Sequence, residues 1–450
     1  MIAPEPFFEP RGTPFSEFHR IRALTTLGHE VDLVTYPFGQ PISMAGLRVF
    51  RSLRPPFVRG AKVGPSLAKI PLDALLTLTA IRRAISGRYD AIHSHEEGGI
   101  IGAVLAAALR VPHLYDMHSS LPQQLTNFAF SRSRFMRRAF DLIERFMIRR
   151  SRVVVVICPA LEDTVRAIDP AARTVLIENA PGSAEDEATP EQADAIRRTF
   201  GLDRVAAVTS GTAVTSGTDV TSGAHVAPGA DVASGFSRTA LTPLILYTGT
   251  FEAYQGLDLL FDAMAIVARA RPDARLMLVG GKPDQISLAR EMAAKAGVEG
   301  VTIFAGEQPA SEIPAYLLAA DVLVSPRSRG TNTPLKIYQY LRAGKAIVAT
   351  RLLTHTQVLN DDTAILTGAT TQEFADGILA ALNDPRRAAR AGANARLLAE
   401  TKYSYEAYLD RTRQACEALT DVQAALQLRA LRRSDDGADV RREAVRRTDR

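Results

Sequence analysis

The chain has 450 residues, more than one hydrophobic core usually holds, so we expect two domains. With 46% hydrophobic and 23% charged residues, the composition is that of a globular protein. The net charge of +5 is uneven, because residues 1–180 hold 23 Lys and Arg against 16 Asp and Glu, which favours an anionic partner for the first half.

Several classes are excluded by what the sequence lacks. Cys158 and Cys416 stand far apart with no His or Cys spacing around them, which excludes a zinc ribbon or a disulfide framework. No apolar run reaches the roughly 18 residues of a membrane span, and no signal-peptide pattern opens the chain. We therefore expect a cytoplasmic protein, and nothing predicts a nucleic-acid partner.

The first half alternates apolar segments with helical patterns, which predicts βαβ units and a parallel sheet. A helix is predicted over 14–27, and strands are predicted at 30–35, 90–93, 112–116 and 153–157. Only three apolar residues precede Pro4, so we expect either a truncated first strand or a misassigned start.

The second half of the chain repeats this alternation of strands and helices. Strands are predicted at 244–248, 275–280, 301–304, 321–325 and 346–349, and helices at 256–269, 285–296, 311–319 and 334–343. The fold class is therefore α/β, with two Rossmann-like doubly wound domains over 1–180 and 244–400 that face a cleft, where ligands are expected.

Three segments lie outside these two domains. Residues 181–243 are predicted to be a linker, and within it 208–235 repeat Ser, Gly and Thr and should form a flexible insertion. Residues 401–420 are expected to form a helix that crosses back to the first domain. The charged tail, 421–450, is expected to be disordered.

The segment 325–350 carries the sharpest local signal, a strand followed by a glycine-containing loop and a helix. Thr333 is predicted as the N-cap and Pro334 as the first helical residue. The amides and dipole of such a helix start suit a phosphate. Lys336, a cation in the first turn, makes sense if a diphosphate supplies the negative charge; the alternative is an ordinary surface lysine.

Two other strand ends are candidates. In 247–260, Gly249 permits close backbone approach, and Glu252 and Gln255 could reach a ligand, although a plain strand-to-helix turn is the alternative. His118 follows a predicted strand end and should project into the mouth of the cleft, although a lone His is more often structural.

Two further patterns could bind a metal ion, or an acceptor or phosphate. His93 and His95 could share a face, but no third metal ligand is evident nearby, so we expect no metal. Gly12 and Thr13 are placed in a loop before the first helix, where amides could contact an acceptor or a phosphate. No G-x-G-x-x-G motif follows any predicted strand, which weakens a nicotinamide-dependent reading.

The segment 131–152 has eight arginines against two acids. Its apolar residues recur at helical spacing and form one stripe: Phe135, Met136, Ala139, Phe140, Ile143, Phe146 and Met147. An interfacial helix on an anionic membrane would show this pattern, and so would a helix packed on its own sheet.

Together these features resemble the retaining glycosyltransferases of the GT-B fold, specifically family 4 (glycosyl transferases group 1). The landmarks, in the order of the family, are RGTP, LGHEVDLVT, YDMHSS, LIENA, YTGTFEAYQGLDLL, LMLVGG, VTIFAGEQPASEIPAYLLAADVLVSPR and TPLKIYQYLRAGKAIVAT. They cover nearly the whole chain except the insertion and the tail.

The resemblance implies roles. The second domain would hold a nucleotide-diphosphate sugar, the first a saccharide or lipid-linked acceptor, and transfer would retain the anomeric configuration without a metal or other cofactor. His118 and Lys336 would be catalytic, and Gly12 and Thr13 would bind the acceptor. The donor-binding residues would be Gly249, Thr250, Glu252, Gln255, Gly280, Phe304, Gly306, Asn332, Thr333, Pro334, Leu335 and Gln339.

The sequence departs from the family at four polar positions. An Arg and a Lys are usual where Thr250 and Gln255 stand, and two glutamates are usual where Thr331 and Gln339 stand. We expect Lys336 or Arg327 to supply the missing positive charge. The alternatives are a catalytically impaired GT-B scaffold and a sugar-nucleotide epimerase, which would need more acidic residues in the cleft.

Overall fold

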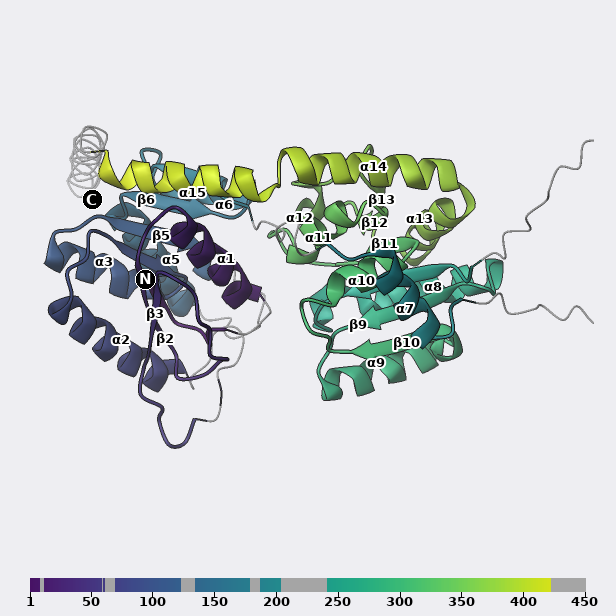
Figure 1. Cartoon of the computed structure of the whole chain (residues 1–450), viewed down its shortest axis with the longest axis horizontal. Helices are drawn as coiled ribbons and strands as arrows, with labels where there is room; N and C mark the ends of the chain where they lie inside the picture. Colours follow the sequence, from purple (N-terminus) through teal and green to yellow (C-terminus); the bar gives the residue numbers. More distant parts are fainter. Residues whose placement is uncertain are drawn as a thin grey trace, which may run out of the picture.

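The computed structural model of the chain describes residues 1–8, 12–58, 60, 69–122, 134–178, 187–203 and 241–421. Two parallel sheets, each covered by helices on both faces, form two domains side by side (Figure 1). The predicted α/β fold class is therefore confirmed. The predicted insertion, 208–235, and all but the first residue of the predicted tail lie outside the described residues.

The N-terminal domain holds a seven-stranded sheet in the order β3-β2-β1-β4-β5-β6-β7. Its strands are β1 (Ile2–Ala3), β2 (Val31–Thr35), β3 (Leu47–Arg51), β4 (Ile92–His95), β5 (His113–Met117), β6 (Val153–Val156) and β7 (Thr174–Leu176). β1 has two residues and yet pairs with β2 and β4 in the middle of the sheet.

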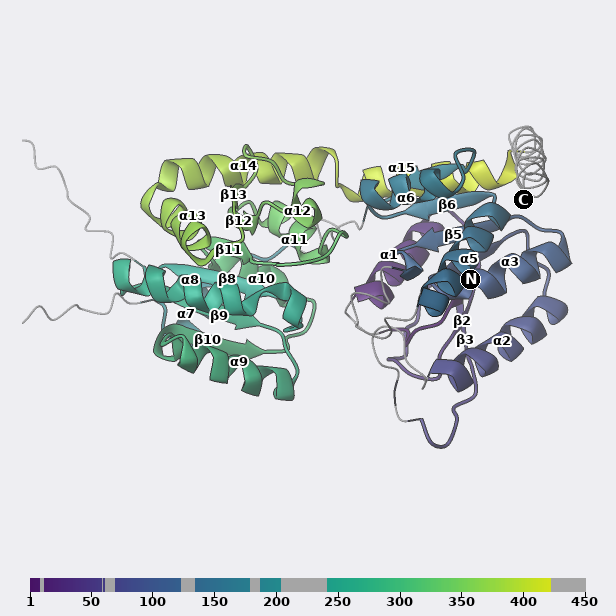
Figure 2. The ribbon, with the colours of Figure 1, turned by 180° about the vertical axis from the view of Figure 1, so that it is seen from behind.

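Alternate residues of a strand point to opposite faces, and the buried sheet uses both faces. In β6, Val154 and Val156 join one core cluster, and Val153 and Val155 join another. The first face is covered by α2 (Lys69–Ser86), α3 (Gly98–Leu109), α5 (Arg134–Arg150) and α6 (Pro159–Ile168) (Figure 2). The second face is covered by α1 (Gly12–Thr26) and the last helix, α15 (Tyr405–Thr420).

The C-terminal domain holds a six-stranded sheet in the order β10-β9-β8-β11-β12-β13. Its strands are β8 (Leu244–Thr248), β9 (Arg275–Val279), β10 (Thr302–Gly306), β11 (Val322–Ser325), β12 (Ala346–Thr350) and β13 (Ile365–Thr367). Its helices are α8 (Leu257–Ala270), α9 (Pro283–Lys295), α10 (Ile313–Ala319), α11 (Leu335–Ala343), α12 (Leu353–Thr356), α13 (Thr371–Asn383) and α14 (Pro385–Thr401), with 3-10 turns η2 (Ala253–Gln255) and η3 (Glu299–Val301).

One helix lies where the sequence analysis placed a linker. α7 (Pro190–Thr199) packs on the C-terminal sheet, and Ala193 and Leu202 join its core. The buried Arg197 donates to the carbonyl of Ala319 at 2.8 Å and pairs with Asp321 at 2.8 Å. These contacts make residues 190–202 part of the C-terminal domain. Elsewhere, none of the described helices combines the length and low charge needed to span a bilayer.

Gly256 lies where two loops approach each other at the carboxyl end of the C-terminal sheet. Gly256, between η2 and α8, has φ +75°, and a Cβ atom there would lie 2.1 Å from the carbonyl oxygen of Pro326. The amide of Ser328 also donates to the carbonyl of Tyr254 at 3.1 Å. Only a residue without a side chain lets these backbones come so close.

Gly256→Ala is therefore expected to lower the free energy of unfolding by about 3 kcal/mol, from the clash and the left-handed backbone together. Gly297→Ala is the matched control, because Gly297 has φ +73° and nothing within 4 Å of an added Cβ. The control should lose only about 1 kcal/mol. Urea denaturation measures both, and equal losses would show that the close approach does not matter.

Candidate functional site

Three glycines lie at the carboxyl ends of the adjacent strands β8, β9 and β10. The amide of Gly249 donates to the carbonyl of Val279 at 2.9 Å, and the amide of Gly280 donates to the carbonyl of Gly306 at 2.7 Å. A Cβ atom at Gly280 would lie 2.1 Å from the oxygen of Gly249, so only glycine fits there. All three were predicted from the sequence, and the fold brings them to the edge where Rossmann-like domains bind ligands.

Helix α11 begins one residue later than predicted. Pro334 is extended, with φ −64° and ψ 136°, and stands as the N-cap residue, so Leu335 is the first helical residue. The prediction of Thr333 as N-cap is wrong because the backbone of Pro334 is extended rather than helical, so the helix starts after the proline. No side chain caps the helix. Within the described residues the amides of Leu335 and Lys336 find no acceptor, so the helix start presents two N–H groups.

Lys336 is buried at this helix start, with 7% of its surface exposed. Its Nζ atom lies 3.8 Å from the centre of the Tyr247 ring and donates to Oε1 of Gln255 at 3.4 Å. Burial lowers the pKa of Lys336 well below its usual value, and the charge of Arg327 lowers it further. The surface-lysine alternative is therefore wrong.

Arg327 is a second cation near Lys336, in the loop between β11 and α11. Its guanidinium donates to the carbonyls of Arg329 and Asn332, both at 2.9 Å, and lies over the ring of Tyr254 at 5.0 Å. Burial lowers the pKa of Arg327. In the described parts of the chain no carboxylate pairs with Arg327 or Lys336, so the charges that would neutralise these two cations are missing.

The loop between β11 and α11 is held from behind by α12. Thr354 donates to the carbonyl of Asn332 at 2.6 Å, and Gln357 donates to the carbonyl of Thr331 at 2.6 Å. His355, fully buried, bonds the hydroxyl of Ser325 at 2.8 Å, and burial lowers its pKa to about 3. The carbonyls of the loop are thereby turned toward α12, which a sequence pattern does not reveal.

The same loop touches the N-terminal domain. Nδ2 of Asn332 donates to the main-chain carbonyl of His118 at 2.6 Å. Beside it, the amide of Ala160 donates to Oε1 of Gln357 at 3.0 Å. Two residues predicted from separate motifs, His118 and Asn332, are therefore direct neighbours across the two domains.

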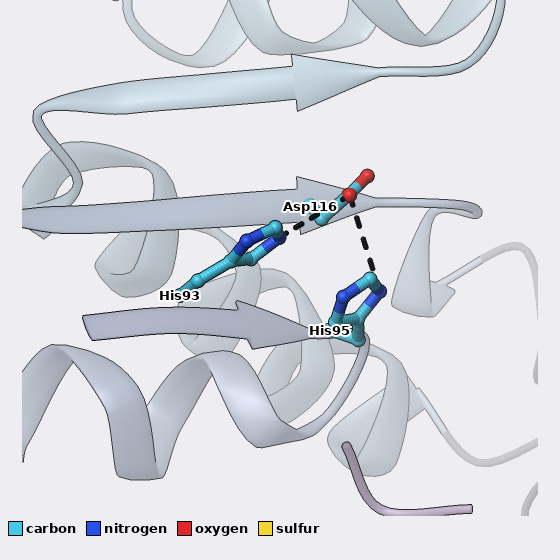
Figure 3. Close-up of side chains that lie close together, drawn as sticks. All are labelled: His93, His95 and Asp116. Atoms are coloured by element: carbon cyan, nitrogen blue, oxygen red, sulfur yellow. Dashed lines mark hydrogen bonds and ion pairs between the residues drawn. The ribbon is translucent and has the colours of Figure 1, made fainter. Parts of the chain in front are cut away.

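His118 belongs to a buried cluster at the carboxyl ends of β4 and β5, of which Figure 3 shows His93, His95 and Asp116. The cluster includes His93, His95 and Asp116, whose nearest ligand atoms lie within 4.8 Å of one another. Asp116 is the third group that the sequence analysis did not find near the two histidines. Its carboxylate is already engaged, because Nε of Arg20 lies 2.9 Å from Oδ2. A divalent cation would have to displace this guanidinium, so the cluster carries no argument for a metal.

Further buried carboxyl groups were missed because each stands alone in the sequence. Burial raises the pKa of Glu17 on α1 to about 8. It raises the pKa of Glu5 well above its usual value, and the neighbouring Glu17 charge adds to this. Burial also raises the pKa of Glu96, whose two carboxylate oxygens share the hydroxyl hydrogen of Ser119 at 3.1 and 3.0 Å. These acids lie at the edge of the N-terminal sheet near His118.

Other predicted donor residues lie at the sheet edge without joining the cationic pair. Thr250 accepts from the hydroxyl of Tyr247 at 2.7 Å through its carbonyl, and the exposed Glu252 accepts from Gln285 at 2.9 Å. The ring of Phe304 packs against Phe261, so only its backbone faces the sheet edge. Gln339 is half-buried on α11, one turn after Lys336.

The predicted acceptor residues, Gly12 and Thr13, are not in a loop. They are the first two residues of α1, and Pro14 follows them. A proline is tolerated in the first turn because its missing N–H would have no partner there. The start of α1 therefore replaces the predicted loop at this position.

Comparison with known protein families decides the class. Residues 239–398 match the glycosyl transferases group 1 family, and residues 19–180 match the glycosyl transferase 4-like domain. The chain belongs to the GT-B glycosyltransferases of this group.

Relatives of this glycosyltransferase act on different sugars. The alpha-D-kanosaminyltransferase of Streptomyces kanamyceticus is 24% identical over 346 residues, which cover 74% of this chain and 77% of that protein. The GDP-mannose-dependent alpha-(1-6)-phosphatidylinositol monomannoside mannosyltransferase of Mycolicibacterium smegmatis is 30% identical over 158 residues, 33% of this chain and 41% of that protein.

Solved structures share the fold. HepE of Anabaena in complex with UDP superposes with a TM-score of 0.65 at 17% identity and covers 94% of this chain and 99% of that chain. Sucrose-phosphate synthase of Thermosynechococcus elongatus superposes with a TM-score of 0.68 at 18% identity, covering 93% and 98%.

The buried charge of Lys336 should lower the stability of the glycosyltransferase. Because burial lowers the pKa of Lys336 below the unfolded value of about 10.4, the charged lysine is less favourable in the folded chain than in the unfolded chain, and it opposes folding at pH 7. Lys336→Met should raise the free energy of unfolding of the free protein at pH 7 by about 1–3 kcal/mol.

The gain should shrink as the pH rises toward 10, where the unfolded lysine also loses its proton. Urea denaturation at several pH values measures it. Lys295→Met is the control, because Lys295 is exposed in the last turn of α9. A Lys336→Met protein less stable than wild type at pH 7 would contradict the proposed cost.

Proposed function

We propose that this glycosyltransferase moves a sugar from a nucleoside-diphosphate sugar to a saccharide or lipid-linked acceptor, with retention of the anomeric configuration and without a bound metal. The observation that carries the proposal is the buried pair of cations, Lys336 and Arg327, beside the free amides of α11 and without any described carboxylate partner. A diphosphate supplies the charge that this arrangement lacks.

The chemistry follows from the charge. A nucleoside-diphosphate leaving group gains negative charge as the bond to the sugar breaks. Lys336, Arg327 and the two amides of α11 stabilise that charge, which is the task that a divalent cation performs in other enzymes. The retained configuration rests on the resemblance to the retaining family 4.

The missing family lysine at position 255 has a local substitute. Lys336 extends from α11 to Gln255 and places its ammonium group 3.4 Å from that side chain. The positive charge therefore reaches the same place from another element. Asn332 holds His118 beside the loop between β11 and α11. This position of His118 suits a contact with the transferred sugar.

UDP and GDP should raise the melting temperature of the wild-type protein, and the Lys336→Met protein should lose this rise because the phosphate contact is gone. Lys295→Met should keep it. With UDP-glucose and GDP-mannose as donors, we expect slow hydrolysis that continues in EDTA and releases the sugar in its original anomeric form, as NMR of the fresh product shows.

The same assays separate this proposal from its alternatives. A nucleotide-induced rise in melting temperature with no hydrolysis of either donor would favour the scaffold without catalytic activity. The absence of any rise would contradict the donor site itself, and an inverted product would contradict retention.

We also propose that α5 places the enzyme on the cytoplasmic face of an anionic membrane, where a lipid-linked acceptor would be found. Part of the predicted apolar stripe packs inward, since Phe140, Ile143 and Met147 contact the sheet core. Phe135 and Leu142 instead remain 82% and 67% exposed.

The exposed apolar side chains of α5 stand among arginines. The described arginines of the helix are Arg137, Arg138, Arg145, Arg149 and Arg150, with Arg134 at its start. Helix α2, which covers the same face of the sheet beyond α3, has exposed apolar residues of its own, Ile70, Leu78 and Ile85. Apolar side chains flanked by cations suit the surface of an anionic bilayer.

The protein should sediment with vesicles of phosphatidylcholine and phosphatidylglycerol but not with phosphatidylcholine alone. Phe135→Ser combined with Leu142→Ser should reduce the bound fraction about tenfold, because the apolar contact is lost. Leu397→Ser is the control, since Leu397 is 58% exposed on α14 of the other domain. Equal binding of all three proteins would contradict a role of α5.

A further inference from the structure

Four ionisable side chains come together where β4 and β5 end, and their roles differ. The two strands are parallel neighbours in which His95 stands opposite Asp116. His93 precedes His95 by two residues and His118 follows Asp116 by two, so all four share one face of the sheet. α1 covers this face and supplies Arg20.

The ring of His118 is contacted at one nitrogen only. Its Nε2 atom lies 3.3 Å from Nδ1 of His95 and 3.3 Å from Oδ1 of Asp116. Within the described residues, Nδ1 of His118 has no hydrogen-bond partner. The two ring nitrogens are therefore in different electrostatic surroundings.

Asp116 is a fixed negative charge beside Nε2. Its side chain is fully buried and pairs with Nε of Arg20 at 2.9 Å. Burial alone would raise the pKa of Asp116, but the adjacent charge of Arg20 opposes this, and the pKa lies well below its usual value. A carboxylate near one nitrogen of a neutral imidazole favours the proton on that nitrogen.

Arg20 is in turn held by the last helix. Its Nη1 atom donates to the hydroxyl of Thr412 at 3.2 Å, and its guanidinium lies over the ring of Tyr408 at 4.9 Å. Both residues belong to α15, which follows the C-terminal domain in the sequence. The contacts thus run from α15 through Arg20 and Asp116 to the ring of His118.

We propose that Asp116 keeps the proton of neutral His118 on Nε2, so that Nδ1 accepts a hydrogen bond from a hydroxyl of the donor sugar. Arg20 and Thr412 are positioning residues that hold Asp116 in place. The contact with the sugar rests on the proposed function, whereas the protonation of the ring does not.

The same geometry argues against the other use of this cluster. A metal ion on His93, His95 and Asp116 would need the carboxylate oxygen that Arg20 already contacts at 2.9 Å, and it would bring a second cation against the guanidinium. The cluster is therefore a set of hydrogen bonds around one anion.

The ring protonation can be measured by two-bond ¹H–¹⁵N correlation spectra of ¹⁵N-histidine-labelled full-length protein, with His118 assigned by His118→Gln. We expect wild-type His118 to carry its proton on Nε2. Asp116→Asn removes the charge, so the Nδ1-protonated form should appear. Arg22→Met is the matched control, because Arg22 also lies on α1 over a tyrosine of α15, Tyr405. Its spectrum should match the wild type.

Turnover gives a second readout that a merely structural role would not produce. With whichever of UDP-glucose and GDP-mannose the wild type hydrolyses, Asp116→Asn should lower kcat about 100-fold and leave the donor KM within about threefold. Thr412→Val, which keeps all buried charges, should lower kcat about tenfold and stands in if Asp116→Asn does not fold.

Two results would overturn the inference. One is a wild-type His118 protonated on Nδ1. The other is an unchanged spectrum and kcat in Thr412→Val and Asp116→Asn, equal to those of Arg22→Met. Hydrolysis of neither donor would count against the proposed function alone, because the spectra need no donor and still decide the ring protonation.

Discussion

The buried ammonium group of Lys336 is the constraint around which the C-terminal domain is arranged. An isolated buried charge is costly, and within the described residues this one contacts an aromatic ring and an amide oxygen. The surrounding structure keeps it in place, since α12 binds the carbonyls of the adjacent loop and leaves the helix start without a cap. Under the proposed function, such an arrangement lowers the stability of the free protein and raises its affinity for a diphosphate.

The two domains contact each other at the loop between β11 and α11, next to Lys336. Asn332, in the loop between β11 and α11, donates to the carbonyl of His118, so a shift of one domain would change the distance between Lys336 and His118. Helix α15 constrains the same spacing from the other side, through Arg20 and Asp116. Under the proposed function, these direct contacts would couple binding of the donor to the placement of His118.

The sequence predicted the features that local patterns determine. The buried central strands have continuous apolar runs, and the glycines at 249, 280 and 306 punctuate strand ends, so both signals were readable. Three strands at the sheet edges or beside them, β3, β7 and β13, were not predicted, because short, half-covered strands have weak patterns.

The remaining site residues depend on contacts far apart in the sequence. Asp116 meets Arg20 across 96 positions, and Gln255 meets Lys336 across 81. No spacing rule joins such pairs. The start of α11 was misplaced for a local reason, because a Thr-Pro pair satisfies the rule for a capped helix and the proline itself moved the boundary.

The path of α15 also has a consequence for how the chain is made. The N-terminal sheet ends with β7 at Leu176, but the helix that buries Leu114 and Val155 on one of its faces begins only at Tyr405. During synthesis the whole second domain emerges before that face is covered. Until α15 packs, part of this apolar face stays exposed and Arg20 lacks its contacts with Thr412 and Tyr408, so the enzyme's first half is completed last.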